Sequence, residues 1–293
     1  MKHYFTSQCH IYILLSYNAD MELLENKFNE IMSSLAKEAD TFGLQISPFR
    51  VGWYNDALKD KRFAFEDDPN TLGFVVISTP SMFEKTFLPY LNQETDPGEN
   101  NFGIKDPLDR CMKETFHRLS KSYRDEYEIV HMHDFEISPI NKRPKVLVQT
   151  AGHVSGAVRF YQKCDLDEET ENDDTNNNES QNSFVNSIHS SKVFPVCLHP
   201  KFGGWFALRG ILLFKNARVG SSYLNPISPP TILKTKYEIA NLLYLFNEHW
   251  RDSRYRDVGM PADIEKYSDL QQQYFGTEPS ARTSLIERIL TSK

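Results

Sequence analysis

The sequence predicts an α+β fold, in which a sheet is flanked by helices. Helical periodicity marks the first and last parts of the chain, and apolar, strand-like runs occupy the middle. The composition, with 40% hydrophobic and 25% charged residues among 293, is typical of a globular protein. A chain of this length buries a sizeable core without disulfides or structural metals. We therefore expect a single domain over residues 21–293, preceded by an N-terminal extension of residues 1–20.

The first half of the domain is predicted to alternate helices and strands. Apolar side chains recur at three- and four-residue steps from Leu24 to Ala39, which predicts an amphipathic helix. Phe74-Val75-Val76-Ile77 is a short apolar run typical of a buried strand. The expected elements are a helix over 20–42, an extended segment over 44–54 with Pro48 at an edge or bulge, a strand over 71–78, a helix over 80–91, a loop over 92–105 and a helix from Pro107.

The second half is predicted to hold four strands, an acidic insertion and three closing helices. Residues 165–191 are polar and rich in Asn, without a periodic apolar face, so they cannot offset the entropy of ordering. We expect them to be a disordered insertion. The other expected elements are strands over 127–137, 146–150, 193–198 and 205–214, a Pro-rich loop over 223–231, and helices over 236–250, 262–275 and 280–290.

The negative charge of the chain is concentrated in this insertion. The net charge is −7, and removing the eight acidic residues between Asp165 and Glu179 leaves +1. The body is therefore near neutral, which argues against nucleic-acid binding driven by overall charge. Two interpretations of the insertion stay open: a tolerated surface loop, since long loops cost little, and a lid over a binding site.

Several other classes of protein lack support in the sequence. The four cysteines, at 9, 111, 164 and 197, show no CxxC spacing, which excludes a zinc ribbon and favours a reducing compartment. No apolar run approaches the roughly 18 residues of a membrane helix. The run Ile11–Leu15 has no convincing signal-peptide cleavage site after it. Neither GxGxxG, GxxxxGK nor GxSxG occurs.

Three histidines have spacings that merit a metal hypothesis. His131 and His133 share one face of a predicted strand, as two ligands must, but no third ligand is spaced to join them. His153 begins an HxxG sequence that in a cobalt-ligating motif has an Asp two residues before it, whereas Ala151 stands there. The alternatives are a strand with two surface histidines and a histidine that caps a turn before Gly156.

Two arginine-containing segments suggest an anion site. Residues 249–257 interleave arginines with aromatics, which suits bidentate binding of carboxylates or phosphates, or an ordinary surface network of Arg251, Asp252, Arg254 and Asp257. In residues 199–210, Gly203 and Gly204 allow a close backbone approach to a ligand or a bulge. Arg209 lies in an apolar strand, where a cation needs either a distant carboxylate or an anionic ligand. The residues alone thus give an α+β domain with an anion site and no reaction.

Taken together, several motifs resemble the cblC family of cobalamin-processing proteins. The resemblance runs from about Met21 to Leu290, with matching order and gaps, and each motif alone is weak. The matching pieces are Trp53-Tyr54-Asn55, Ser78-Thr79-Pro80-Ser81-Met82-Phe83, Asp106-Pro107-Leu108-Asp109, Arg143-Pro144-Lys145, Gln149 to Val154, His199 to Gly210, His249 to Asp257, Tyr274-Phe275 and Arg282.

The resemblance implies a flavin nitroreductase-like mixed sheet and two reactions on base-off cobalamin. In one, a glutathione thiolate removes the alkyl group of an alkylcobalamin and leaves cob(I)alamin and a thioether. In the other, reduced FAD or FMN reduces cyanocobalamin and cyanide leaves. It also implies a cytoplasmic protein without nucleic-acid or membrane partners, which hands cobalamin to a cblD-type trafficking protein and, further along, to methionine synthase and its reductase.

The family's binding residues carry over onto two sets of positions, with no metal site and no side-chain nucleophile. Cys197 is expected to pack against the corrin, because no His is placed in sequence to activate it. Phe160 stands where vertebrate members carry Tyr, so a hydroxyl contact is lost, whereas Val148 and Leu208 are apolar exchanges. The implied cobalamin contacts are Asp134, Val146, Leu147, Val148, Gln149, Phe160, Tyr161, Gln162, Cys197 and Leu208, and the implied glutathione contacts are Arg209, Arg256 and Arg282.

Two alternatives to this enzyme stay open from the sequence. A carrier would bind cobalamin tightly and form little product with glutathione. A nitroreductase-type flavin oxidoreductase would hold stoichiometric flavin and have no affinity for cobalamin.

Overall fold

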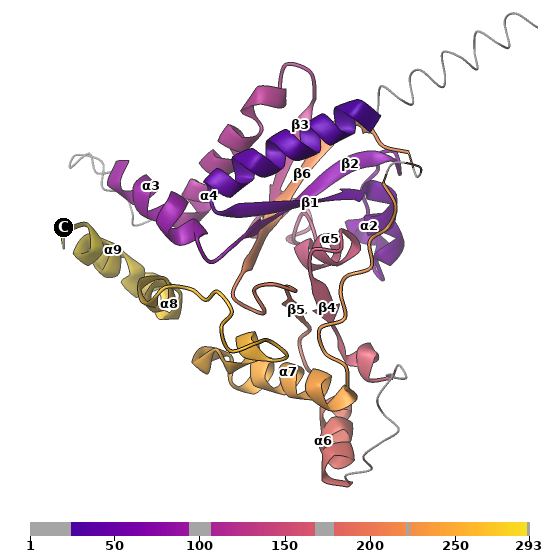
Figure 1. The fold of residues 1–293 in the computed structure, drawn as a ribbon, viewed down its shortest axis with the longest axis vertical. Helices are drawn as coiled ribbons and strands as arrows, with labels where there is room; N and C mark the ends of the chain where they lie inside the picture. Colours follow the sequence, from indigo (N-terminus) through magenta and orange to yellow (C-terminus); the bar gives the residue numbers. More distant parts are fainter. Residues whose placement is uncertain (1–24, 94–106, 168–178, 221, 223, 292–293) are drawn as a thin grey trace, which may run out of the picture.

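The computed structural model describes residues 25–93, 107–167, 179–220, 222 and 224–291 (Figure 1). Its centre is a four-stranded antiparallel sheet in the order β1-β2-β6-β3. A separate antiparallel ribbon pairs β4 with β5. The predicted extension of residues 1–20 lies outside the described residues. The strands are β1 Leu44–Arg50, β2 Thr71–Ser78, β3 Ile129–His133, β4 Arg159–Tyr161, β5 Val196–Leu198 and β6 Ala207–Arg218.

Helices cover both faces of the sheet, because the strands are apolar on both sides (Figure 1). Along β2, Phe74 and Val76 belong to one core, and Val75 and Ile77 belong to the other. On the first face lie a helix over residues 25–41, a π-helical turn Phe83–Phe87, α3 Leu88–Gln93, α4 Pro107–Leu119, α8 Asp269–Gly276 and α9 Arg282–Thr291, and on the second lie α2 Val51–Ala57 and α5 Val148–Val154.

The β4–β5 ribbon forms a third apolar cluster with two further helices, α6 Glu179–Ser190 and α7 Lys236–Glu248. In Figure 1 these elements lie beyond one end of the sheet. The Phe184 ring of α6 lies 5.7 Å from the ring of Tyr237 and 5.6 Å from that of Tyr244, both on α7. Ile188 of α6 is 7% exposed. The ribbon is thus fixed against α7, and its position shapes the cavity described below.

The predicted α+β class is confirmed, with corrections to individual elements. All strand pairs among the described residues are antiparallel, so the expected mixed sheet is wrong. The expected strand over 146–150 is replaced by α5, because a short buried apolar run also suits a helix with one face against the core. Likewise α2 begins at Val51, inside the expected extended segment, whereas Pro48 does lie on an edge strand.

The expectation that the whole of residues 165–191 is disordered is also wrong. Asp165 and Leu166 are buried at the end of a 3₁₀ turn, Lys163–Leu166, and residues 179–190 form α6. The helix is stable because Phe184 and Ile188, four residues apart, lie on one face and reach α7. Residues 168–178, which carry most of the acidic charge, lie outside the described part of the chain.

Candidate functional site

A cavity of about 460 Å³ opens where the β4–β5 ribbon meets the sheet. Its walls come from the segment between β3 and α5, the first turn of α5, β5, the start of β6, and the turn Arg254–Asp257 that follows α7. Most of the lining is apolar, with amide and charged groups at a few positions. The lining residues are Asp134, Pro144, Val146, Leu147, Val148, Gln149, Pro195, Val196, Cys197, Gly204, Phe206, Ala207, Leu208, Phe246, Tyr255 and Arg256.

The cavity brings together most of the residues expected to contact cobalamin. Seven of the ten line it: Asp134, Val146, Leu147, Val148, Gln149, Cys197 and Leu208. Phe160 is not among the lining residues, but it is paired with Cys197 across the ribbon. Because opposed residues of an antiparallel pair share a face, Phe160 extends the cavity wall on the side of Cys197.

Tyr161 and Gln162 have structural roles outside this wall. Tyr161 is 1% exposed, and its hydroxyl accepts hydrogen bonds from the backbone amides of Ile232 and Leu233 at 3.2 and 2.9 Å. The Gln162 amide donates to the Asp165 carboxylate at 2.5 Å and begins the 3₁₀ turn. A role of either side chain in cobalamin binding stays a prediction.

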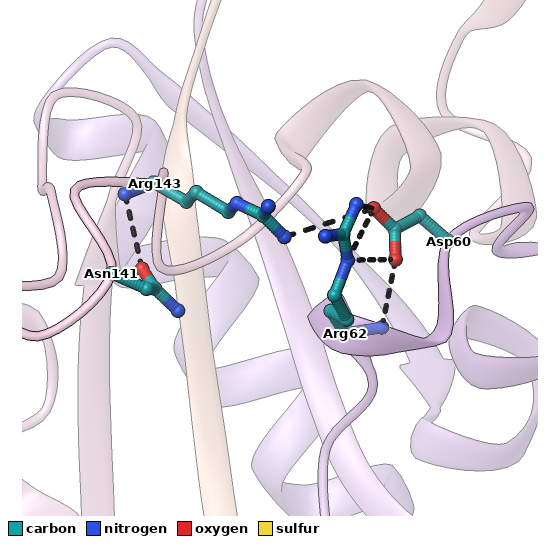
Figure 2. Close-up of polar contacts among 4 residues, drawn as sticks. All are labelled: Asp60, Arg62, Asn141 and Arg143. Atoms are coloured by element: carbon teal, nitrogen blue, oxygen red, sulfur yellow. Dashed lines mark hydrogen bonds and ion pairs between the residues drawn. The ribbon is translucent and has the colours of Figure 1, made fainter.

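The segment that carries Pro144 to Leu147 is anchored at two places. The Leu147 amide donates to the Tyr54 hydroxyl at 3.0 Å, and Tyr54 is fully buried. Figure 2 shows the second anchor, where Arg143 reaches towards Asp60 at 3.9 Å and Arg62 binds the same carboxylate at 2.6 Å. The hydrogen bonds from the Arg62 side chain and backbone amide lower the pKa of Asp60 to about 2. The exposed ion pairs are individually weak, so the buried Tyr54 hydroxyl is the firmer support of this wall.

Burial shifts the pKa of two ionisable groups of the wall. Burial raises the pKa of the Cys197 thiol well above its ordinary value, so the thiol keeps its proton at neutral pH. Cys197 therefore lines the cavity as a protonated thiol, and its packing against a corrin stays a prediction. Burial also raises the pKa of Asp134, while the nearby Arg209 lowers it.

A β-bulge places Arg209 beside the cavity. The pairing of β2 with β6 shifts between Val76–Gly210 and Ile77–Leu208, which leaves Arg209 as the extra residue. Gly210 adopts φ 141°, a conformation that favours glycine, and such a bulge redirects the side chain that it carries. Arg209 is 8% exposed, as the sequence predicts for an arginine in an apolar strand.

The guanidinium of Arg209 is only partly satisfied. Its Nε donates to Ser78 Oγ at 2.9 Å, and its carbon Cζ lies 5.9 Å from the centroid of the Phe275 ring. Its Nη2 is buried without a hydrogen-bond partner in the described residues. A buried, unpaired donor on a cation is costly and suits an anionic ligand.

Arg256 lines the cavity because two glycines let its backbone approach closely. Gly204 donates its amide to the Arg256 carbonyl at 2.9 Å, and the Arg256 guanidinium donates back to the Gly204 carbonyl. A Cβ on Gly204 would lie 2.7 Å from Arg256 Cα, and Gly203 has φ 55°. The close approach expected for this glycine pair is thus to Arg256 rather than directly to a ligand.

All three predicted glutathione residues stack on aromatic rings. The Arg256 Cζ lies 5.4, 4.9 and 5.2 Å from the ring centroids of Trp205, Tyr255 and Tyr267. The Arg282 Cζ lies 5.0 Å from the Tyr274 ring, and its Nε donates to the Thr277 carbonyl at 3.1 Å. Arg282 is not among the cavity-lining residues, so its part in ligand binding stays a prediction.

The other arginines of the 249–257 segment form surface ion pairs that match the expected network only in part, because Asp257 pairs with Lys266 instead. Arg254 pairs with Asp252 at 2.8 Å, and Arg251 lies 3.7 Å from Glu278, all on exposed side chains. The segment therefore contains two kinds of arginine: Arg251 and Arg254 form surface ion pairs, whereas Arg256 lines the cavity.

The histidines of the predicted motifs have structural partners. His131 Nε2 lies 2.9 Å from Ser120 Oγ, and His133 stacks on Phe135. Burial lowers the pKa of both imidazoles to about 4. Among the described residues no three His, Cys, Asp or Glu side chains are grouped to hold a metal ion, which argues against the metal hypothesis. His153 Nδ1 accepts the Phe160 amide at 3.3 Å and stands outside the cavity lining, which favours its turn-capping role.

Sequence reasoning missed the rings that surround the arginines and two cavity residues, Phe206 and Phe246. The motif Tyr274-Phe275 belonged to the resemblance, but no local signal connected it with Arg209 in β6. Tyr267 has no motif at all. Only the fold brings these rings to the arginines.

Comparisons with known proteins give consistent matches over most of the chain. The family described as methylmalonic aciduria and homocystinuria type C matches residues 43–286. A chicken protein named cyanocobalamin reductase / alkylcobalamin dealkylase is 38% identical over 246 residues, which are 83% of this chain and 90% of that protein. A zebrafish protein of the same name is 34% identical over 92% of this chain and 96% of its own length. The crystal structure of a B12-trafficking protein CblC from Caenorhabditis elegans, described as a human MMACHC homologue, superposes with a TM-score of 0.72 at 27% identity, covering 89% of this chain and 95% of that one.

Proposed function

The chain belongs to the methylmalonic aciduria and homocystinuria type C family, and from that premise we propose that it processes cobalamin, both as an alkylcobalamin dealkylase and as a cyanocobalamin reductase. The observation that carries the proposal is the composition of one cavity. Its apolar walls and Gln149 suit a corrin, which is a broad apolar ring edged with amides. Arg256 lines the same cavity, and Arg209 adjoins it through Leu208. A corrin and an anionic co-substrate therefore have places side by side.

In the proposed dealkylation the co-substrate is glutathione, a thiol with two carboxylates. Arg209 and Arg256 bind these carboxylates. Arg282, which stacks on the Tyr274 ring, contributes a third cation. The thiolate is the attacking form, and the positive field of the arginines favours it over the thiol. The sulfur attacks the alkyl carbon, a carbon–sulfur bond forms, and the cobalt–carbon bond breaks with both electrons left on cobalt. The products are cob(I)alamin and a thioether, and the arginines contribute by positioning.

The proposed decyanation needs an electron donor, for which the family implies reduced FAD or FMN. Two lining residues outside the expected cobalamin contacts suit part of such a molecule, because Phe206 offers an apolar surface and Arg256 offers a cation for its phosphate. Bound there, a reduced flavin supplies electrons to cobalt and cyanide leaves as the anion. We also propose that the fold is nitroreductase-like, as the family resemblance implies.

The wider setting follows the family as well. We infer a cytoplasmic protein that passes cobalamin to a cblD-type partner and onward to methionine synthase and its reductase. Among the described residues, no helix has the length and hydropathy of a membrane span.

An anaerobic absorbance titration with methylcobalamin, followed by glutathione, tests the proposal. We expect a base-off spectrum on binding and then the cob(I)alamin spectrum. Arg209→Ala or Arg256→Ala should lower kcat/KM for glutathione by about tenfold to a hundredfold while the base-off shift remains, because each removes charged hydrogen bonds. Arg254→Ala, on the surface network, is the matched control.

The other outcomes separate the alternatives. A base-off shift without any product, with glutathione or with reduced flavin, would favour a carrier. Stoichiometric flavin without a cobalamin shift would favour an unrelated flavin oxidoreductase. Full glutathione turnover in both arginine variants would show that the arginines do not bind the thiol.

A further inference from the structure

The rings around the arginines form a continuous row. Trp205 contacts Tyr267 with centroids 5.5 Å apart, Tyr267 contacts Phe275 at 5.5 Å, and Phe275 contacts Tyr274 at 5.5 Å. Trp205 comes from the turn before β6, Tyr267 from the segment before α8, and Tyr274 and Phe275 from α8 itself. Arg256 stacks at the Trp205–Tyr267 end of the row, and Arg209 stacks on Phe275.

The rings replace the carboxylates that normally hold buried or half-buried arginines. In the part of the chain that the structure describes, neither Arg209 nor Arg256 has a carboxylate oxygen within 4.0 Å. The nearest acid in sequence, Asp257, is used elsewhere: its two oxygens accept from Trp205 Nε1 at 2.7 Å and Lys266 Nζ at 2.8 Å. Asp257 therefore fixes a ring of the row and leaves Arg256 unpaired.

This difference has a chemical consequence for an anion site. A carboxylate that held Arg256 would neutralise it and compete with the carboxylates of a ligand. An aromatic face attracts a guanidinium without neutralising it and without using the outward N–H donors. A pair of arginines held by rings thus keeps both its position and its charge.

Tyr267 is the central member of the row. It is 6% exposed, and its ring contacts Arg256 directly and touches the Phe275 ring under Arg209. Burial raises the pKa of the Tyr267 hydroxyl, whereas the charges of Arg256 and Arg209 and a hydrogen bond from Arg256 act to lower it.

We propose that Tyr267 is a positioning residue for co-substrate binding, whose ring face holds Arg256 and, through Phe275, Arg209 in the spacing that the two carboxylates of glutathione require. The inference rests on the proposed function, because it assumes that the two arginines bind the thiol. Tyr267 acts through the arginines and contacts neither the sulfur nor the cobalt.

Replacement of the ring by an aliphatic side chain tests the proposal. In Tyr267→Leu and Tyr267→Met we expect KM for glutathione to rise about three- to tenfold, the usual range for a cation–π contact, with little change in kcat. The conservative Tyr267→Phe keeps the ring face and removes only the hydroxyl contact with Arg256, so its KM should lie much closer to the wild-type value than that of either aliphatic variant. Tyr237→Leu is the matched control and should behave as the wild type, because this half-exposed ring of α7 contacts no cation among the residues that the structure describes.

Folding is checked by the base-off shift with methylcobalamin, which each variant must retain with wild-type affinity. Should Tyr267→Leu fail to fold, Tyr267→Met fills the same space with a flexible apolar chain and decides the question. A double-mutant cycle supplies a readout that mere destabilisation would not give. In the Arg256→Ala background, Tyr267→Met should have a smaller effect on kcat/KM for glutathione than in the wild type, because only the contribution through Phe275 and Arg209 remains.

The outcomes distinguish this inference from the proposed function. Loss of thiol turnover in the arginine variants with an unchanged KM in both ringless Tyr267 variants would overturn the positioning role alone. Equal effects of Tyr267→Met with and without Arg256 would also overturn it. Wild-type glutathione turnover in Arg209→Ala and Arg256→Ala would instead overturn the proposed function on which it rests.

Discussion

Gly204 and Arg256 bind each other reciprocally across 52 residues of sequence. The Gly204 amide donates to the Arg256 carbonyl at 2.9 Å, and the Arg256 guanidinium donates to the Gly204 carbonyl. The contact fixes both the backbone and the side chain of the arginine. The arginine that lines the cavity is therefore placed by a glycine rather than by an acid.

Gly204→Ala should displace Arg256 and weaken the co-substrate site. The new Cβ would lie 2.7 Å from Arg256 Cα, a backbone atom that cannot move alone. Overpacking of this kind costs about 1–3 kcal/mol. If that strain falls on the arginine, KM for glutathione rises about five- to a hundredfold, which steady-state kinetics would measure.

Gly276→Ala is the control for this substitution, because a Cβ there meets no atom within 4 Å. It should leave both KM and the thermal midpoint at their wild-type values. Equal KM values for Gly204→Ala and the wild type would contradict the assignment of this contact to Arg256.

Tyr54→Phe should loosen the wall that carries Leu147. The variant removes the fully buried hydroxyl that accepts the Leu147 amide at 3.0 Å and leaves that donor unpaired. The free energy of unfolding should fall by about 1–3 kcal/mol, measured by urea denaturation. Cobalamin affinity should fall as well, since Leu147 lines the cavity.

Tyr237→Phe tests whether the effect belongs to the hydroxyl at this place. Tyr237 is 40% exposed, so the loss of its hydroxyl should cost almost nothing. Identical stabilities for Tyr54→Phe and the wild type would show that water replaces the lost acceptor.

The sequence predicts those parts of the fold that depend on local pattern. The run Phe74–Ile77 was expected to be a buried strand, and it is, because helices cover both faces of β2. The strand predicted from Val146 is wrong, because an apolar stretch of five residues does not distinguish a strand from the first turn of α5. Phe184 and Ile188 form an apolar stripe that is too short to predict α6 unless the contact with α7 is known.

The features of the site also differ in whether the sequence alone can predict them. Arg209 could be identified from sequence as a buried cation that needs a partner, and its burial is confirmed. Its bulge could not, because a bulge is defined by the pairing with β2. Nor could the row of Trp205, Tyr267 and Phe275, whose members come from separate elements and meet only in the fold.

Stability should fall as the pH drops from 6.5 to about 4. Burial lowers the pKa of His133 and His199 from 6.5 to about 4, and both side chains are 3% exposed. Between these values the folded protein keeps both imidazoles neutral, whereas the unfolded chain binds protons. Unfolding therefore takes up protons, and each histidine contributes a slope of up to about 1.4 kcal/mol per pH unit. Urea denaturation across this range measures the slope.

His133→Phe isolates one of these contributions. The new ring can keep the stacking on Phe135 and has no titrating nitrogen. The free energy of unfolding of this variant should change with pH by up to about 1.4 kcal/mol per pH unit less than that of the wild type, which corresponds to one proton. An unchanged slope would show that His133 binds no proton on unfolding in this range.

Cys197→Ala should leave the turnover number for glutathione intact. The Cys197 thiol lines the cavity, but burial raises its pKa far above neutrality, so it carries no thiolate to attack an alkyl group. The substitution removes one sulfur from the wall, and the lost packing should weaken cobalamin binding by less than about tenfold. Exposed Cys164→Ala serves as the control for general effects of thiol removal. Single-turnover measurements with methylcobalamin separate the two effects, since binding changes the base-off titration and chemistry changes the rate of cob(I)alamin formation. A variant that binds cobalamin normally and forms no cob(I)alamin would make Cys197 part of the chemistry. The glutathione held by the arginines would then not be sufficient as the source of the attacking thiolate.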